Sequence, residues 1–223
     1  MPLVGKAESH PPTGSHAARS LISRIAKPIY LSGTLDGAQF EMHIDRALSV
    51  MSITPARLLV AVEGGTVFLK ITGRASVACS VDFQKLVAGL KERGLSNFVC
   101  NLKDCLMMDS TFLGVLAGFS LKLMQSNPGA HEPRFVLANA SERIFDSIDN
   151  MGMSAYFKFA SDTLADHRYS ETGPCSATKI DITRASLEAH ELLMSLHPAN
   201  VEKFKDVAEF LAEELKRLEK GVS

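Results

Sequence analysis

Residues 106–116, Leu-Met-Met-Asp-Ser-Thr-Phe-Leu-Gly-Val-Leu, decide the fold of this chain. An apolar run typical of a buried strand stops at Asp109, two hydroxyl residues follow, and an apolar helix then begins. We therefore expect Ser110 and Thr111 at the N-terminus of a helix, where unpaired backbone N–H groups can accept a phosphate group. Asp109 is expected to cap that helix, for a typical gain of about 1 kcal/mol.

Strand and helix patterns alternate on both sides of this stretch. Gly64-Gly65 lies between two β-rich runs and predicts a tight hairpin, and Asn127–Gly129 is a strong helix breaker. The expected strands are 58–63, 66–72, 97–102, 134–138 and 156–159, and the expected helices are 81–93, 110–125 and 142–151. The order β-β-α-β-α-β-α-β predicts an α/β fold with a mixed, largely parallel sheet.

Two further helices are expected near the C-terminus, as a helical hairpin. Residues 186–196 form the first, and the second, capped by Asn200, repeats apolar residues at spacings of 4, 3, 4 and 3. This stripe, which we call the C-terminal stripe, consists of Phe204, Ala208, Leu211, Leu215 and Leu218. Two heptads are too few for an independent coiled coil, so the stripe packs on the first helix, on the domain or on a partner. A homodimer through the hairpin is one such option.

The chain is therefore divided into four segments. Residues 1–56 are an N-terminal extension of low burial potential, expected to be disordered, of which 1–50 are interpreted as dispensable, with Met51 as a candidate true start. Residues 57–163 form the main domain, 164–184 a polar linker, and 185–220 the hairpin.

Composition excludes several classes of protein. The 223 residues carry a net charge of −1 and are 46% apolar, which is typical of a soluble globular protein without a basic surface for nucleic acid. The longest apolar run is too short to span a bilayer. The four cysteines form no Cys-x-x-Cys pair, so we interpret them as reduced thiols of a cytoplasmic protein, with a reactive Cys175 as the alternative.

The sequence shows no metal-ligand set, P-loop or nucleophile–base pair, so we expect no cofactor, no metal and no enzymatic activity. His190 and His197 lie two turns apart on one helix, and a surface or capping role is the interpretation.

Three motifs within 58–163 resemble the STAS family, the fold of anti-sigma factor antagonists. Ile71-Thr72-Gly73 is similar to the turn that ends the family's second strand, and Val99–Asp104 (Val-Cys-Asn-Leu-Lys-Asp) resembles its hydrophobic-Asn-Leu-x-Asp strand end. Met108–Gly114 (Met-Asp-Ser-Thr-Phe-Leu-Gly) resembles the family's Met-Asp-Ser-Ser/Thr-Gly-Leu-Gly switch.

The resemblance implies a bacterial transcription regulator that works by partner switching. In that family, the serine after the aspartate is phosphorylated by an anti-sigma factor serine kinase, and a serine phosphatase reverses the reaction. That position is Ser110, with Thr111 as the second candidate. A phosphoryl group adds about −1.5 to −2 charges, so the unmodified protein would hold the kinase and the phosphorylated protein would release it.

The sequence departs from the family pattern at two places. Phe112 replaces a glycine of the family motif, and its ring would either crowd a kinase or form a hydrophobic docking knob. The turn Arg74-Ala75-Ser76 lacks the acidic residue that the family has there. The expected partner-binding residues are Asp109, Phe112, Gly73, Arg74 and Ser76. These departures favour an alternative function, a constitutive STAS scaffold or subunit of a lipid-transport or stress-sensing assembly.

Overall fold

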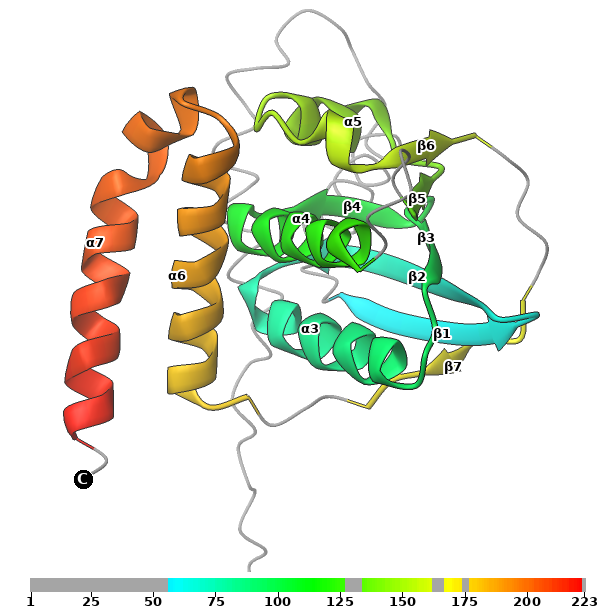
Figure 1. The fold of residues 1–223 in the computed structure, drawn as a ribbon, viewed down its shortest axis with the longest axis horizontal. Helices are drawn as coiled ribbons and strands as arrows, with labels where there is room; N and C mark the ends of the chain where they lie inside the picture. Colours follow the sequence, from blue (N-terminus) through cyan, green and yellow to red (C-terminus); the bar gives the residue numbers. More distant parts are fainter. Residues whose placement is uncertain (1–55, 127–133, 162–166, 174–176, 222–223) are drawn as a thin grey trace, which may run out of the picture. The chain divides into compact units, whose positions relative to one another are not determined.

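The computed structural model describes residues 56–126, 134–161, 167–173 and 177–221 (Figure 1). The expected N-terminal extension, 1–56, thus lies outside the described residues except for Ala56. The Asn127–Gly129 breaker and Cys175 also lie outside them.

The described strands form one mixed sheet in the order β6-β5-β3-β2-β1-β7, with β4 pairing with β2 as well. Strand β1 is antiparallel to β2 and β7, and the other pairs are parallel. The strands are β1 (Arg57–Glu63), β2 (Thr66–Ala75), β3 (Asn97–Asn101), β4 (Cys105–Met108), β5 (Phe135–Ala138), β6 (Lys158–Ala160) and β7 (Ser170–Glu171). The predicted fold class, a mixed and largely parallel α/β sheet, is confirmed.

Strand β2 does not end at Gly73, as the sequence motif indicated, but continues to Ala75. Its pairing with β4 shifts register between Gly73 and Arg74, and Gly73 has φ of 74°, a conformation that glycine adopts without steric cost. The shift lets β2 extend toward the β4 end, which brings Ser76 close to the residues that follow β4.

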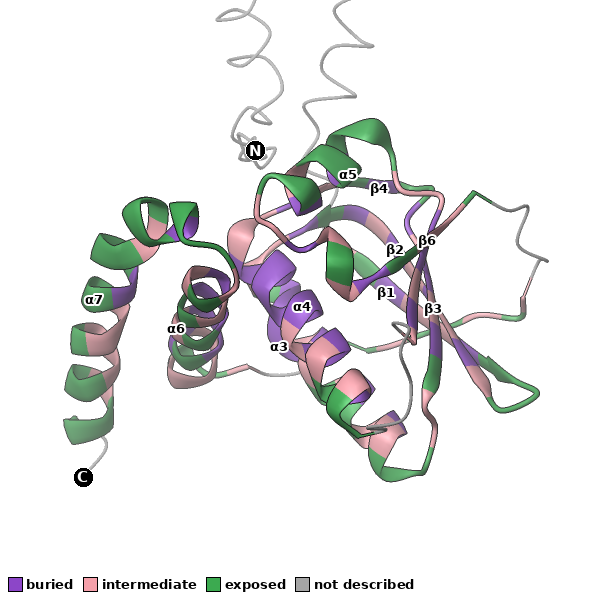
Figure 2. Cartoon of the chain, turned by 45° about the horizontal axis from the view of Figure 1, so that its top comes forward, coloured by how far each residue is buried: buried purple, intermediate pink, exposed green. Residues whose placement is uncertain are grey.

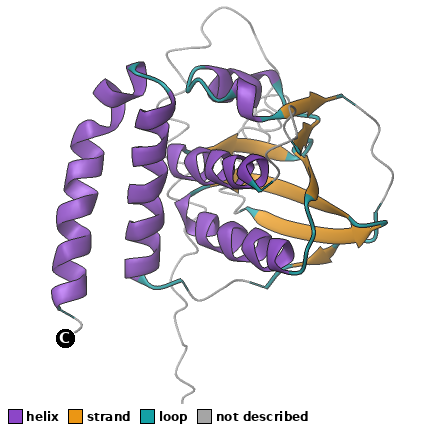
Figure 3. Cartoon of the chain, viewed as in Figure 1, coloured by secondary structure: helices purple, strands orange, loops and turns teal. Residues whose placement is uncertain are grey.

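The helices between the strands lie on one side of this sheet, and the C-terminal pair stands beside these helices (Figure 3). Their bounds are α3 (Val77–Glu92), α4 (Ser110–Gln125), α5 (Glu142–Asp149), α6 (Lys179–Leu196) and α7 (Ala199–Lys220), with a short 3₁₀ turn, η1 (Ser154–Tyr156).

Three helices begin earlier than the sequence indicated. Helix α7 begins at Ala199 with Pro198 as its N-cap, so the expectation that Asn200 caps it is wrong. Helix α3 begins at Val77 with Ser76 as its N-cap, rather than after Ser80. Helix α6 begins at Lys179, inside the predicted linker 164–184, because Thr178 and Asp181 form a capping box: Asp181 N donates to Thr178 Oγ1 at 3.1 Å and Thr178 N to Asp181 Oδ2 at 3.0 Å.

Aromatic rings fill the layer between the sheet and helices α3 and α4. Phe98 and Phe135 on the strands meet Phe119 of α4 edge to face, with ring centroids 4.8 and 5.4 Å away. Phe83 of α3 packs on Phe112 of α4 at 5.2 Å. Helix α4 is consequently buried over most of its length (Figure 2).

Helix α6 packs across α3 and α4, and α7 packs on the outer side of α6 (Figure 1). The C-terminal stripe thus lies within the hairpin, where the Phe204 ring contacts the His190 ring at 4.9 Å. Of the three options left open by the sequence, packing on the first helix is the one observed. Among the described residues, no helix combines the length and the apolar character needed to cross a membrane.

Candidate functional site

The carboxylate of Asp109 lies between the N-termini of two helices. Its Oδ1 accepts a hydrogen bond from Phe112 N at 2.8 Å, and its Oδ2 accepts one from Val77 N at 2.7 Å. The first bond caps α4, as predicted, and the second satisfies the first turn of α3. One negative charge therefore faces the positive ends of two helix dipoles and holds them together.

Ser110 is the first residue of α4, and its hydroxyl faces α6. Its Oγ lies 2.9 Å from Nε2 of His190, whose side chain is 6% exposed. The other ring nitrogen, Nδ1, lies 2.8 Å from the carbonyl oxygen of Ser186. Because a carbonyl only accepts, Nδ1 carries the proton in the neutral imidazole, and the Ser110 hydroxyl donates to Nε2.

The contact between α4 and α6 continues along both helices, and we call it the α4–α6 seam. Thr111 is 5% exposed, and its Oγ1 donates to Ser186 Oγ at 3.4 Å. A Cβ placed on Gly114 would lie 2.6 Å from the carbonyl oxygen of Ala189, so the two backbones touch. One turn later, a Cβ on Gly118 would lie 3.2 Å from Leu192. Only glycine at 114 permits this approach.

The remaining predicted site residues fall into two groups. Gly73, Arg74 and Ser76 lie where β2 leads into α3, beside β4 and close to Asp109, and Arg74 is exposed. Phe112 is different, because its side chain is 0% exposed. The expectation that Phe112 forms a docking knob is therefore wrong: its ring packs on Phe83 in the core.

The pair of Ser110 and His190 corrects two sequence-based interpretations. No nucleophile–base pair was visible in the sequence, and His190 was assigned a surface or capping role, yet the two side chains meet across 80 positions. Such a pair activates a nucleophile when substrate can reach it. Here the imidazole is buried beneath Phe204. The contact joins α6 to the start of α4.

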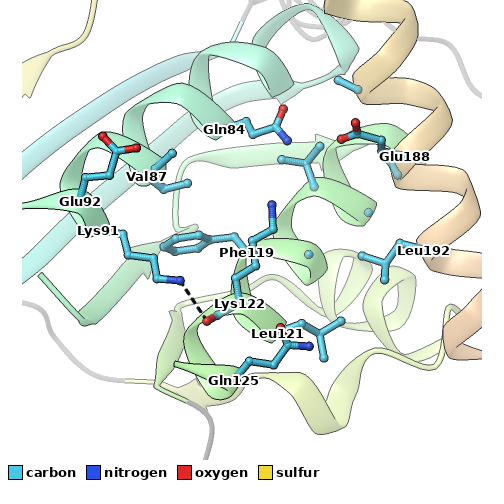
Figure 4. A pocket seen from close by; sticks show the side chains of 16 residues that line it. Gln84, Val87, Lys91, Glu92, Phe119, Leu121, Lys122, Gln125, Glu188 and Leu192 are labelled. Atoms are coloured by element: carbon cyan, nitrogen blue, oxygen red, sulfur yellow. Dashed lines mark hydrogen bonds between the residues drawn. The ribbon is translucent and has the colours of Figure 1, made fainter. Parts of the chain in front are cut away.

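A cavity of about 630 Å³ opens between α3, α4 and α6, further along the seam (Figure 4). Val87, Phe119 and Leu192 give it apolar walls. Lys91 of α3 donates from Nζ to the carbonyl oxygen of Lys122 at 3.2 Å and so spans one end. The described residues gather no group of three His, Cys, Asp or Glu that could hold a metal ion.

No family model matches this sequence, and neither does any curated protein. Solved structures do match it. One is a protein of Thermotoga maritima described as a candidate anti-sigma factor antagonist, with 20% identity over 47% of this chain and 86% of that chain and a TM-score of 0.40. An anti-sigma factor antagonist from Mycobacterium paratuberculosis matches with 16% identity over 49% of this chain and 88% of that chain, at a TM-score of 0.42.

A third match is SpoIIAA, a Bacillus cell fate determinant solved in its phosphorylated form. It has 18% identity over 48% of this chain and 93% of that chain, with a TM-score of 0.39. Structural neighbours of this chain thus include anti-sigma factor antagonists, the family whose motifs the sequence resembles.

Proposed function

We propose that this protein is a regulatory protein-binding module that is switched by phosphorylation of Ser110. The observation that carries the proposal is the position of the Ser110 hydroxyl: it lies on the first residue of α4, beside the carboxylate that joins α3 to α4. The dipole of α4 favours an anion there. The Asp109 carboxylate opposes one, so a phosphoryl group would change the charge of this surface strongly.

Ser110 is favoured over Thr111 as the modified residue. Its hydroxyl is partly buried and held by a single contact with His190, whereas Thr111 is 5% exposed and lies inside the seam. In this proposal the unmodified protein binds an anti-sigma factor kinase of the serine type, and the phosphorylated protein releases it. A serine phosphatase restores binding. In the proposal the contact surface comprises Asp109, next to Ser110, and the β2–α3 connection, where Arg74 is exposed and Ser76 half-buried, whereas Gly73 is buried and contributes only backbone geometry.

Phosphopeptide mass spectrometry on the protein from its native cells tests the proposal. The peptide that contains residues 106–116 should carry one phosphate at Ser110 under some growth condition. A Ser110→Ala variant should lose it, and a Thr111→Ala variant should keep it. No phosphate at either residue under any condition would overturn the switch.

Affinity capture from the same cells provides the second test. Ser110→Ala should retain an ATPase of the kinase type, and Ser110→Asp should release it, because the new carboxylate adds to the charge of Asp109. The constitutive scaffold predicts instead that both variants capture the same partner equally, and that result would replace the proposed switch with the scaffold.

A further inference from the structure

Helix α6 lies on the surface that a partner must reach in order to recognise Ser110. It crosses the start of α4 and the middle of α3, where Lys85 and Asp181 form an ion pair at 4.0 Å. His190 then covers the Ser110 hydroxyl, and Ala189 covers Gly114. The face formed by these two helices, here named the α3–α4 face, is therefore covered in part by a segment of the same chain.

We propose that α6 and a protein partner compete for the α3–α4 face, so that the C-terminal hairpin controls when the partner binds. The proposal rests on the function proposed above and names the regulation of the same site. The closed form, with α6 in place, shields Ser110. The open form, with α6 displaced, presents Ser110 and the α3–α4 face together.

The shape and chemistry of the α3–α4 face define the kind of partner it accepts. Gly114 lets another backbone approach closely only where that segment carries a small side chain, as Ala189 does. Ser110 needs a hydrogen-bond acceptor opposite it, which is His190 in the closed form. A partner that replaces α6 is thus an amphipathic helix with a small residue and an acceptor on one face, the helix-in-groove mode of recognition.

Phosphorylation of Ser110 is also incompatible with the closed form. Ser110 Oγ and His190 Nε2 are 2.9 Å apart, a hydrogen-bond distance that leaves no room for a phosphorus atom and three oxygens. A kinase therefore has to act on the open form. Because only that form binds, the apparent affinity for a partner falls in proportion to its population.

The turn between α6 and α7 is attached to the segment that follows α5 by hydrogen bonds of its own. Asn200, at the start of α7, is 0% exposed and donates from Nδ2 to the carbonyl oxygens of Met151 and Leu193 at 3.0 and 2.8 Å. Lys203 Nζ donates to the carbonyl oxygen of Asn150 at 3.2 Å. The contacts with Met151 and Asn150 lie away from Ser110, so in the proposed open form they hold the α6–α7 turn in place while the start of α6 separates from α4.

Amide hydrogen exchange on the full, unphosphorylated chain tests whether α6 can leave the α3–α4 face, which the competition requires. An Ala189→Leu variant places bulk against Gly114 without altering the α3–α4 face. We expect the amides of α6 to exchange roughly tenfold or more faster, with β2 and β3 unchanged, because overpacking a tight contact favours local opening. The matched control is Glu191→Leu, which introduces the same residue at an exposed position of α6.

A second pair of variants opens the seam from the other side. Gly114→Ala adds a Cβ that collides with Ala189, whereas Gly89→Ala adds one to α3 where nothing lies within 4 Å. Only the first should accelerate exchange in α6. If neither Ala189→Leu nor Gly114→Ala folds, the wild-type profile decides: α6 less protected than β3 supports the proposal.

The proposal would be overturned if the α6 amides exchanged at the same rate as the β3 amides in the wild type and in every variant that folds. Helix α6 would then be a fixed part of the core. This experiment involves neither kinase nor phosphate, so its failure leaves the phosphorylation of Ser110 untouched. Conversely, absence of phosphate on Ser110 leaves the exchange result intact.

Discussion

The backbone N–H of Val77 donates to the Asp109 carboxylate at 2.7 Å, and this bond joins the start of α3 to the start of α4. The same carboxylate accepts from Phe112 N. Removing it would leave an unsatisfied donor at the N-terminus of each helix. Because both donors are partly buried, the structural role of Asp109 exceeds that of an ordinary N-cap.

We predict that Asp109→Ala lowers the free energy of unfolding by about 2–3 kcal/mol, the sum of a lost cap and a lost bond to a charged acceptor. Urea denaturation measures the change. Asp109→Asn should recover only part of the loss, because its single amide oxygen cannot accept from both helices. The control is Asp104→Ala, which breaks a partly exposed ion pair with Lys70 and should cost under about 1 kcal/mol. Equal losses for Asp109→Ala and Asp104→Ala would contradict the bridging role.

Phe112 is predicted to act through stability and not through surface contact with a partner. Its side chain is 0% exposed and packs on Phe83, so Phe112→Ala should lower the free energy of unfolding by about 3–5 kcal/mol. Phe210, on the outer side of α7, is 66% exposed, and Phe210→Ala should change stability by less than about 0.5 kcal/mol. Thermal or urea unfolding of the two variants distinguishes them. If Phe112→Ala changed the free energy of unfolding only slightly, the Phe112 side chain would have to lie on the surface and not in the core.

The sequence alone predicts the alternation of strands and helices and the start of α4 at Ser110, because both depend on local periodicity and capping. It was misleading at Phe112, where a family position suggested a surface residue. The helical spacing of Phe112, Leu116 and Phe119 assigns that side chain to the core, and the structure agrees.

The contact between Ser110 and His190 could not be derived from local patterns, since it joins residues 80 positions apart. A weaker signal was present in the sequence. Ser186, Ala189, His190 and Leu193 follow the spacing of one helical face, and all four are buried. That pattern places His190 on the inner side of α6, but only the packing of α6 on α4 identifies the serine it meets.

The described cysteines are predicted to be unreactive thiols in the folded protein. Cys79, Cys100 and Cys105 are free and buried, and burial raises the pKa of the Cys105 thiol to about 11. Burial raises the pKa of Cys79 and Cys100 as well. Since the thiolate is the nucleophile, all three should fail to react with a thiol reagent at pH 8.

Titration with a disulfide reagent checks this prediction. In the native protein at most one thiol, that of Cys175, should react with the reagent. The other three thiols should react only after denaturant is added. A Cys175→Ser variant serves as the control and should show no reactive thiol before unfolding. Two or more fast thiols in that variant would show that the core opens readily.

The link between α6 and α7 is predicted to weaken in acid. Glu214 of α7 accepts hydrogen bonds from Arg217 at 2.8 Å and from Lys179 of α6 at 2.7 Å, and these cations lower the pKa of Glu214 to about 2. A carboxylate with a lowered pKa in the folded state adds stability above its unfolded pKa of 4.5. That stability is fully present above this value and is lost as the pH falls toward 2.

NMR titration of the Glu214 carboxyl carbon should therefore give a midpoint well below 4.5. Glu214→Gln should reduce the melting temperature by a constant amount at neutral pH, and the difference should shrink steadily below pH 4.5 as the wild type loses the same charge. Glu202→Gln is the control, because Glu202 pairs with Lys205 of the same helix and, among the described residues, forms no ion pair with α6. A Glu214 midpoint near 4.5, or a melting difference that does not depend on pH, would show that the ion pair with Lys179 does not hold α7 against α6 and that the pair with Arg217 within α7 adds no stability.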